Sequence, residues 1–142
     1  MTGLNVTFIE RLENGATEAA VRVFPRDGGT DCAGTPRVCQ PIADLVPDGV
    51  PKGVSATRDL IFVTSDTELG LFTGVLSAFD ARLEQNCGGT PKRCTPVWSQ
   101  LAYVSGTWAP AIANGHIAVS GRAGGGFIPN PGVRVFSIPP VG

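Results

Sequence analysis

The sequence has little that would hold the chain to a nucleic acid or a membrane. Its formal charge is −1, from 11 Lys and Arg against 12 Asp and Glu, and it contains no basic block. Nothing therefore draws it electrostatically onto nucleic acid or anionic lipid. No apolar run approaches the roughly 18 residues that a membrane-spanning helix needs. Residues 1–15 lack a basic start followed by an apolar stretch, so they do not fit a signal peptide.

What the sequence does contain is turn formers and strand formers. Its 142 residues include 19 Gly and 12 Pro, which disfavours a bundle of long helices. Leu, Ile, Val and Phe number 38, too many for an intrinsically disordered chain. Val, Ile and Thr number 34, and β-branched residues favour strands. The length suits one domain, and the composition predicts a soluble, loop-rich, all-β chain.

An internal repeat organises the chain. The segment CAGTPRVC at 32–39 recurs as CGGTPKRC at 87–94, an offset of 55 residues. Between residues 21–41 and 76–96, seven of 21 positions are identical. Two further matches continue in order, at offsets of 56 and 57: 60–63 with 116–119, and 75–79 with 132–136. Self-similarity at a fixed period indicates a repeat architecture.

Each repeat predicts about four short strands. In the second repeat and beyond, the expected strands are 76–80, 96–100, 108–113, 116–120 and 133–138, the last after a long loop at 121–132. Asn114-Gly115 is a strong hairpin signal, because both positions must tolerate positive φ. Four strands make one blade of a β-propeller.

The predicted fold class is therefore all-β, a partial β-propeller of about two and a half four-stranded antiparallel blades. The expected division is 1–20 as the tail of a preceding blade, 21–75 as the first repeat, 76–132 as the second repeat, and 133–142 as the first strand of a further blade. Residues 6–9 match 61–64 at offset 55, which keeps apolar residues aligned; an offset of 56 would swap the buried face. The open edges invite pairing with further blades or copies of the chain.

The four cysteines are the most specific chemical feature. Cys32 with Cys39 and Cys87 with Cys94 each form a Cys-x6-Cys pair around a Gly-Thr-Pro turn, which brings the sulfurs together. Structural zinc sites use tighter knuckles. We expect two disulfides, with reduced thiols and a metal site as the alternatives. Disulfides imply an oxidising, extracytoplasmic compartment, and the lack of a signal peptide then suggests a native N-terminus upstream of Met1.

The remaining chemical candidates have structural interpretations. His116, the one histidine, is expected to be a strand residue beside a hairpin turn, because no nucleophile or orienting carboxylate is assigned to it. The glycine-rich run 121–126 lacks the Gly-Lys-Ser/Thr ending and the following helix of a phosphate loop. Asn5 fits a glycosylation acceptor. The scattered acids, Asp44, Asp48, Asp66 and Glu68, show no paired-carboxylate pattern. We expect no catalytic, cofactor-binding or metal-binding residues.

Most of the chain resembles the PQQ-like β-propeller repeat family, strongly over 76–136 and weakly over 21–75. The motifs that carry the resemblance are LSAFDA at 76–81, the Cys-x6-Cys loop, PVWS at 96–99 and PAIANGHIAV at 110–119. The resemblance implies that Ala78 and Asp80 form the family's Ala-x-Asp strand. It also implies that Trp98 is the downstream tryptophan and that Gly115 lies in the Pro-x-x-x-x-Gly-x-x-x-Val stretch. The residues themselves suggest structural roles: a tryptophan stacks between blades, and an aspartate after a strand caps loop N–H groups.

The resemblance implies a non-catalytic module that serves as a binding or interaction scaffold, as part of a larger extracytoplasmic propeller. Its partners would be further blades, copies of itself or another protein, without nucleic acid or membrane insertion. One alternative is a fragment of a PQQ-dependent dehydrogenase, which would need PQQ and calcium. Another is a short chain that completes a propeller by self-association.

Overall fold

The structure is a computed structural model that describes residues 6–11, 19–26, 32–67, 74–102, 104, 108–123 and 130–140. Within these residues the chain is all-β, as the composition predicts, and it contains no helix. A helix long and apolar enough to cross a membrane is accordingly not found among them.

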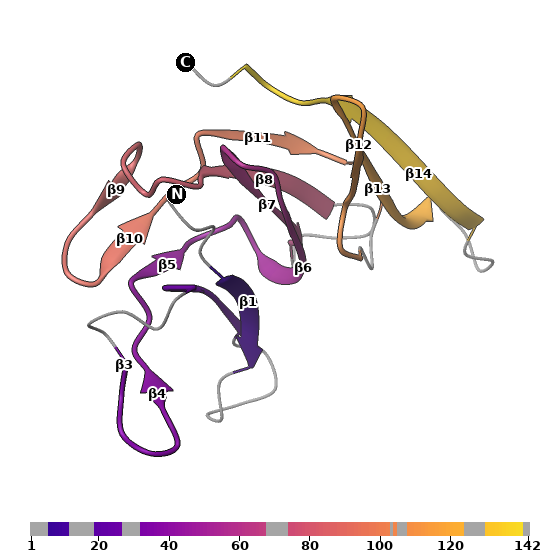
Figure 1. Ribbon diagram of the computed structural model, residues 1–142. Helices are drawn as coiled ribbons and strands as arrows, with labels where there is room; N and C mark the ends of the chain where they lie inside the picture. Colours follow the sequence, from indigo (N-terminus) through magenta and orange to yellow (C-terminus); the bar gives the residue numbers. More distant parts are fainter. Residues whose placement is uncertain are drawn as a thin grey trace.

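Three sheets follow one another along the chain, and a small hairpin projects from the first (Figure 1). The N-terminal sheet has the order β1 (Val6–Arg11), β2 (Ala19–Phe24), β5 (Ala43–Leu45), β10 (Lys92–Cys94), β9 (Cys87–Gly88). The middle sheet has the order β11 (Trp98–Leu101), β8 (Gly74–Asp80), β7 (Leu60–Asp66), β6 (Val50–Ala56). The C-terminal sheet has the order β12 (Ala111–Ala113), β13 (His116–Ala123), β14 (Asn130–Ser137). The projecting hairpin consists of β3 (Cys32–Ala33) and β4 (Val38–Cys39).

The predicted strands of the second repeat are present as β8, β11, β12, β13 and β14. The predicted long loop at 121–132 is wrong at both ends, because β13 extends to Ala123 and β14 begins at Asn130. Gly121 stands opposite Gly132 and Ala123 opposite Asn130 in the ladder. Once β13 and β14 pair, the backbone hydrogen bonds extend the ladder through residues with low strand propensity.

The strand registers repeat with the sequence. Val6 stands opposite Phe24 in the N-terminal sheet, as Ile61 stands opposite Phe79 in the middle sheet. Both members of the pair are shifted by 55, which is the offset preferred from the apolar pattern. The pair Ile117 and Phe136 continues the series in the C-terminal sheet.

A sheet combines strands from two consecutive sequence repeats. The strand β8 begins the second sequence repeat but is the third strand along the chain in the middle sheet, after β6 and β7. In the same way, β14 begins a further repeat and is the third strand along the chain in the C-terminal sheet. The residue at which a sequence repeat is taken to start is arbitrary, whereas a sheet starts with the first of its strands along the chain.

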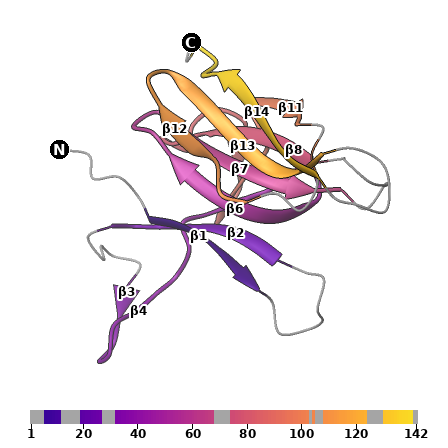
Figure 2. The ribbon, with the colours of Figure 1, turned by 90° about the vertical axis from the view of Figure 1, so that its right-hand side faces the viewer.

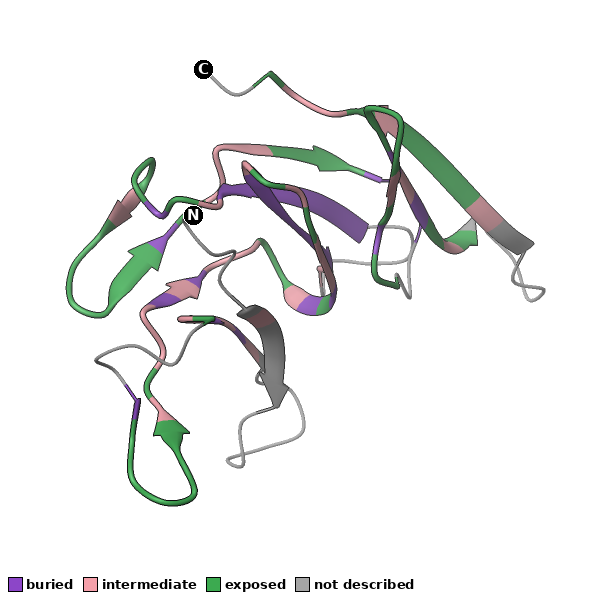
Figure 3. Ribbon diagram, viewed as in Figure 1, coloured by how far each residue is buried: buried purple, intermediate pink, exposed green. Residues whose placement is uncertain are grey.

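Two apolar clusters join the three sheets (Figure 3). The first cluster lies between the N-terminal and middle sheets: Val21, Val23, Ala43, Leu45, Ile61, Val63, Phe79, Leu83 and Cys94. The second lies between the middle and C-terminal sheets: Leu60, Phe62, Leu76, Ala78, Ala102, Val104, Ile117 and Val119. Successive residues of a strand point to opposite faces, so β7 and β8 contribute alternately to both clusters. Every residue of β8 is therefore buried.

Glycine allows the connection between the middle and C-terminal sheets to pass close to β6. A Cβ on Gly53 would lie 2.3 Å from both Cα and N of Ala109. The Thr64 hydroxyl donates to the Trp108 carbonyl oxygen at 2.8 Å, and the Ser55 hydroxyl donates to that of Pro110. These contacts fix the start of the C-terminal sheet against the middle sheet.

Candidate functional site

The two cysteine pairs are disulfides, as the spacing predicts. Cys32 is bonded to Cys39 and Cys87 to Cys94, and no free cysteine remains. Each disulfide closes a two-stranded hairpin: the first hairpin is β3–β4 and the second hairpin is β9–β10. The structure thus gives both pairs the disulfide arrangement, the first of the three interpretations that the spacing left open.

The second hairpin joins the middle and N-terminal sheets. Its strand β10 pairs in parallel with β5, with Lys92 opposite Ala43 and Cys94 opposite Leu45. The Val46 N–H donates to the Cys94 carbonyl oxygen at 2.8 Å, and Cys94 is fully buried in the first cluster. The segment leading into β11 thus forms part of the preceding sheet, and the disulfide holds it in the required shape.

Asp80 fixes the loop that leads into the second hairpin. Its carboxylate accepts backbone N–H bonds from Arg82 at 3.0 Å, Glu84 at 3.0 Å and Gln85 at 2.9 Å. The capping role expected from the sequence is therefore observed. Burial raises the pKa of the Asp80 carboxyl, but the three N–H donors and the Arg82 guanidinium together outweigh it. The pKa lies below its ordinary value of 3.8.

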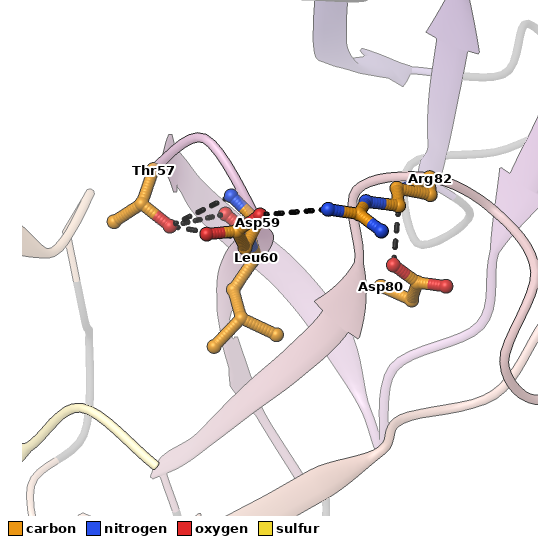
Figure 4. Close-up of polar contacts among 5 residues, drawn as sticks. All are labelled: Thr57, Asp59, Leu60, Asp80 and Arg82. Carbon is orange, nitrogen blue, oxygen red and sulfur yellow. Dashed lines mark hydrogen bonds and ion pairs between the residues drawn. The ribbon is translucent and has the colours of Figure 1, made fainter. Parts of the chain in front are cut away.

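The turn between β6 and β7 supports the same loop (Figure 4). The Thr57 hydroxyl accepts the Leu60 N–H at 3.1 Å, and the Asp59 carbonyl oxygen accepts the Ala81 N–H at 3.0 Å. An exposed ion pair joins Asp59 to Arg82 at 3.6 Å. The turn and the Asp80 carboxylate thus both position the backbone of this loop.

The second hairpin has two further anchors. The Lys92 Nζ donates to the Leu83 carbonyl oxygen at 2.7 Å, and Leu83 is itself buried in the first cluster. The Asn86 side-chain amide donates to the Pro96 carbonyl oxygen at 2.9 Å. These side chains hold the loop, the hairpin and the start of β11 as one unit.

The first hairpin differs from the second in its surroundings. Its strands pair with each other, and no further strand joins them among the residues that the structure describes. Val38 in β4 is 62% exposed. The two repeats also differ in sequence here: the position of the capping Asp80 is occupied by Pro25 in the first repeat, which has no carboxylate to cap a loop.

The other motif residues are structural. Ala78 and Trp98 lie at the contact between the middle and C-terminal sheets, and Gly115 lies in the turn between β12 and β13. Ala78 is fully buried in the second cluster. Trp98 packs against that cluster and contacts the Phe136 ring edge-on, at a centroid distance of 6.1 Å. Gly115, with φ of 76°, and Asn114, with φ of 48°, form the tight turn between β12 and β13. These positions stabilise sheet packing and chain reversal.

The remaining candidates are dispersed. His116 is exposed on β13, and its Nδ1 lies 2.9 Å from the Asn114 carbonyl oxygen. Asp44 forms an ion pair with Arg22 at 3.6 Å. Asp48 precedes β6 and Asp66 ends β7, so both lie at the end of the β6–β7 pair that is far from its turn, where the Ser65 hydroxyl donates to the Asp48 carbonyl oxygen. Asn5, Glu68 and 124–126 lie outside the described residues.

No metal centre emerges from this arrangement. Over the described ranges, no three His, Cys, Asp or Glu side chains gather closely enough to hold an ion. The feature that sequence reasoning missed is the parallel pairing of β10 with β5. It joins only three residues of each strand, Lys92–Cys94 and Ala43–Leu45, which lie far apart in the sequence and show no strand pattern, so no sequence signal could have found it.

Comparison of the chain with protein-family models, with curated proteins and with solved structures finds no match. The repeat, the registers and the two clusters are therefore the observations on which a function can be built.

Proposed function

We propose that the chain is a non-catalytic segment of a β-propeller of the PQQ-like repeat type, which serves as an interaction scaffold. One observation carries the proposal: three successive sheets stack through two apolar clusters built from equivalent repeat positions. Stacking of successive four-stranded antiparallel sheets about an axis is the building rule of a propeller. The middle sheet has four strands, which is the number in one blade.

The use of the motif residues supports a scaffold. The Asp80 carboxylate is occupied by three backbone N–H groups. Trp98 is occupied by packing against Phe136 of the next sheet. A side chain that caps backbone groups or packs between sheets has little capacity left for catalysis. Its loss would destabilise the fold rather than a reaction intermediate.

The two disulfides support an extracytoplasmic location, because disulfides persist in oxidising compartments. In such a location each disulfide-closed hairpin keeps its shape without relying on a large core. A repeat scaffold of this kind binds through the surfaces that stacked units present together.

A ligand titration tests the non-catalytic part of the proposal. PQQ and calcium are added together and separately, and the melting temperature is followed by calorimetry. A specific ligand at about 100 times its dissociation constant would stabilise the fold by about 2.7 kcal/mol, which raises Tm by roughly 5–11 °C for a chain of this size. We expect the melting temperature to change by less than about 1 °C, which is small beside that rise. A rise of the larger size with PQQ and calcium together would favour the dehydrogenase fragment instead.

Small-angle X-ray scattering tests the propeller part. Sheets arranged about an axis give a flat arc or disc, whereas sheets stacked in one direction give an elongated rod. The rod profile would contradict the proposal.

The ligand titration described above has its own positive control, which is a PQQ-loaded dehydrogenase measured alongside.

A further inference from the structure

The C-terminal sheet has one strand fewer than the middle sheet. In the middle sheet β11 lies on the side of β8 that faces away from β7, and in the N-terminal sheet β5 lies beside β2 in the same way. We call β11 and β5 the flanking strands. The equivalent of β8 and β2 in the C-terminal sheet is β14, and no strand of the described residues pairs with its free edge. Figure 2 views the molecule from this side, with β13 between β12 and β14.

Both flanking strands begin with the same backbone hydrogen bond. The Val97 N–H, just before β11, donates to the Ala78 carbonyl oxygen at 2.8 Å. The Ile42 N–H, just before β5, donates to the Val23 carbonyl oxygen at 2.8 Å. Ala78, Val23 and Val135 occupy the same register position in β8, β2 and β14. The Val135 carbonyl oxygen is therefore the first acceptor for a flanking strand on β14.

The flanking strand β5 matches β2 by an apolar, acidic, apolar pattern. Ala43 and Leu45 are buried in the first cluster together with the valines that stand opposite them in β2. Between them Asp44 stands opposite Arg22, and the two side chains form an ion pair at 3.6 Å. Because successive side chains alternate between faces, this ion pair lies on the other face of the sheet.

Arg134 holds the position of Arg22 in β14. Both residues stand at the register position of Ser77 in β8, which has the uncharged Ser99 opposite it in β11. Charged and uncharged residues thus each have a matching partner across the flanking pair. Arg134 is exposed, and the described part of the chain offers it no ion-pair partner. A carboxylate opposite Arg134 would form a favourable cross-strand pair, whereas a basic residue would be repelled.

The apolar positions of β14 are open in the same way. Val133 and Val135 stand where Leu76 and Ala78 stand in β8. Leu76 and Ala78 are 0% exposed, whereas Val133 is 60% and Val135 is 63% exposed. An unpaired strand edge with apolar side chains is a template for pairing with another strand. Apolar residues opposite the two valines would extend their face, as those of β5 extend the face of β2.

We propose that the free edge of β14 binds an extended segment of a partner protein, antiparallel, with the pattern apolar–acidic–apolar. The acidic side chain would stand opposite Arg134, and the apolar ones opposite Val135 and Val133. In strand addition of this kind, backbone hydrogen bonds give affinity and side chains give specificity. The inference rests on the proposed function, because it names the class of partner that the scaffold binds.

The charge of Arg134 favours such a partner over a second copy of this chain. Antiparallel pairing of two β14 edges, in the register that sets Val133 of each copy opposite Val135 of the other, would place the two Arg134 residues opposite each other. Like charges directly opposite in a sheet are destabilising. A segment with an acidic residue at this position forms a favourable pair instead.

A peptide titration tests the proposal. The probe is a fluorescein-labelled peptide with the sequence of residues 41–47, PIADLVP, which contains the pattern of β5. The full chain is added, and fluorescence polarisation is followed. We expect saturable binding with a dissociation constant below about 1 mM. A peptide methylated on the Ile42 nitrogen has no N–H to donate to the Val135 carbonyl oxygen and should bind about 10-fold more weakly.

A charge exchange tests the register. The variant Arg134→Glu should bind the parent peptide about 5–30-fold more weakly, because an attractive pair becomes a repulsive one. It should bind the peptide with Asp44→Lys more tightly than the parent chain does. Arg122→Glu is the matched control, since Arg122 is also exposed but lies on β13, inside the sheet. This control should bind the parent peptide like the parent chain. Both variants replace exposed side chains and should keep the parent's melting temperature.

Several outcomes would overturn the proposal. They are a titration that does not saturate below about 1 mM, equal weakening by Arg122→Glu, and binding that Arg134→Glu leaves unchanged. Binding that is lost in a variant of Arg22 instead would mean that the peptide displaces β5. A parent chain that is dimeric by light scattering and becomes monomeric with the peptide would assign the edge to a second copy.

Failure of this inference can be distinguished from failure of the proposed function. A rise in Tm with PQQ and calcium, or a rod-shaped scattering profile, would overturn the scaffold and leave the peptide data unchanged. A peptide that does not bind a chain with the profile of a flat arc would overturn the edge site alone.

Discussion

Replacement of Asp80 by alanine tests how the loop before the second hairpin is held. The residue is only 6% exposed, and its carboxylate accepts three backbone N–H bonds at 2.9–3.0 Å. Hydrogen bonds to a charged group contribute more than neutral ones, about 1.5–3 kcal/mol each. Arg82, Glu84 and Gln85 are exposed, however, so their N–H groups regain water when the carboxylate is removed.

We therefore assign about 1 kcal/mol to each lost bond, a value below that range, and about 3 kcal/mol to Asp80→Ala. For a chain near this length, 1 kcal/mol lowers Tm by about 2–4 °C, so the expected fall is roughly 6–12 °C. Asp80→Asn keeps one acceptor oxygen and should lose about half as much.

The acid dependence of stability gives an independent check. The folded pKa of Asp80 lies below its ordinary value, so its stabilisation is present above about pH 4 and is lost as the pH falls through the folded pKa. The difference in Tm between the parent protein and Asp80→Asn should accordingly narrow below about pH 4. Calorimetry between neutral and acidic pH measures both quantities.

Asp59→Asn is the matched control, because Asp59 also faces Arg82 but forms only an exposed ion pair. Such pairs contribute about 0–1 kcal/mol, so Tm should change by no more than about 4 °C. Equal effects of the Asp59 and Asp80 substitutions, or a fall below about 2 °C for Asp80→Ala, would refute the assignment of the three N–H bonds.

Two further substitutions test close packing and the hairpin disulfide. In Gly53→Ala the new Cβ would overlap the Ala109 backbone, and we expect a loss of about 1–3 kcal/mol in urea unfolding. Gly88→Ala meets nothing within 4 Å and should stay within about 0.5 kcal/mol; equal losses would contradict the close approach. Replacing Cys87 and Cys94 together by serine removes an eight-residue loop constraint of about 2.5 kcal/mol. Because Cys94 is buried between sheets, this loss should exceed that of the same change in the first hairpin, and the reverse order would disagree with the pairing of β10 and β5.

Local features of the fold could be predicted because their causes are local. The β-branched runs indicated the strands, and Asn114-Gly115 indicated the turn, since both residues adopt positive φ there. The offset of 55 indicated the equivalence of Val6 and Ile61 that the registers reproduce. The run 121–132 was misjudged because pairing between β13 and β14 outweighs the propensity of its glycines and prolines.

The candidate site could be predicted only in part. The spacing of each cysteine pair sufficed for the disulfides, because a short loop around a tight turn brings the two sulfurs together. The position of Asp80 after a strand was enough to predict that it caps a loop. It was not enough to predict which backbone N–H groups donate to its carboxylate. The approach of Ala109 to Gly53 had no signal, since it joins segments that are distant in the sequence.

Composition, period and spacing were enough to predict the all-β class, the repeat, the disulfide pairs and the apolar positions, because they express short-range physics. Which face of each sheet packs on which becomes known only from the packed sheets. The tertiary structure also placed β10 on β5 and left Val133 and Val135 exposed where Leu76 and Ala78 are buried. Those outcomes depend on how whole sheets meet, and a pattern of alternating residues is identical whether its second face is covered or open.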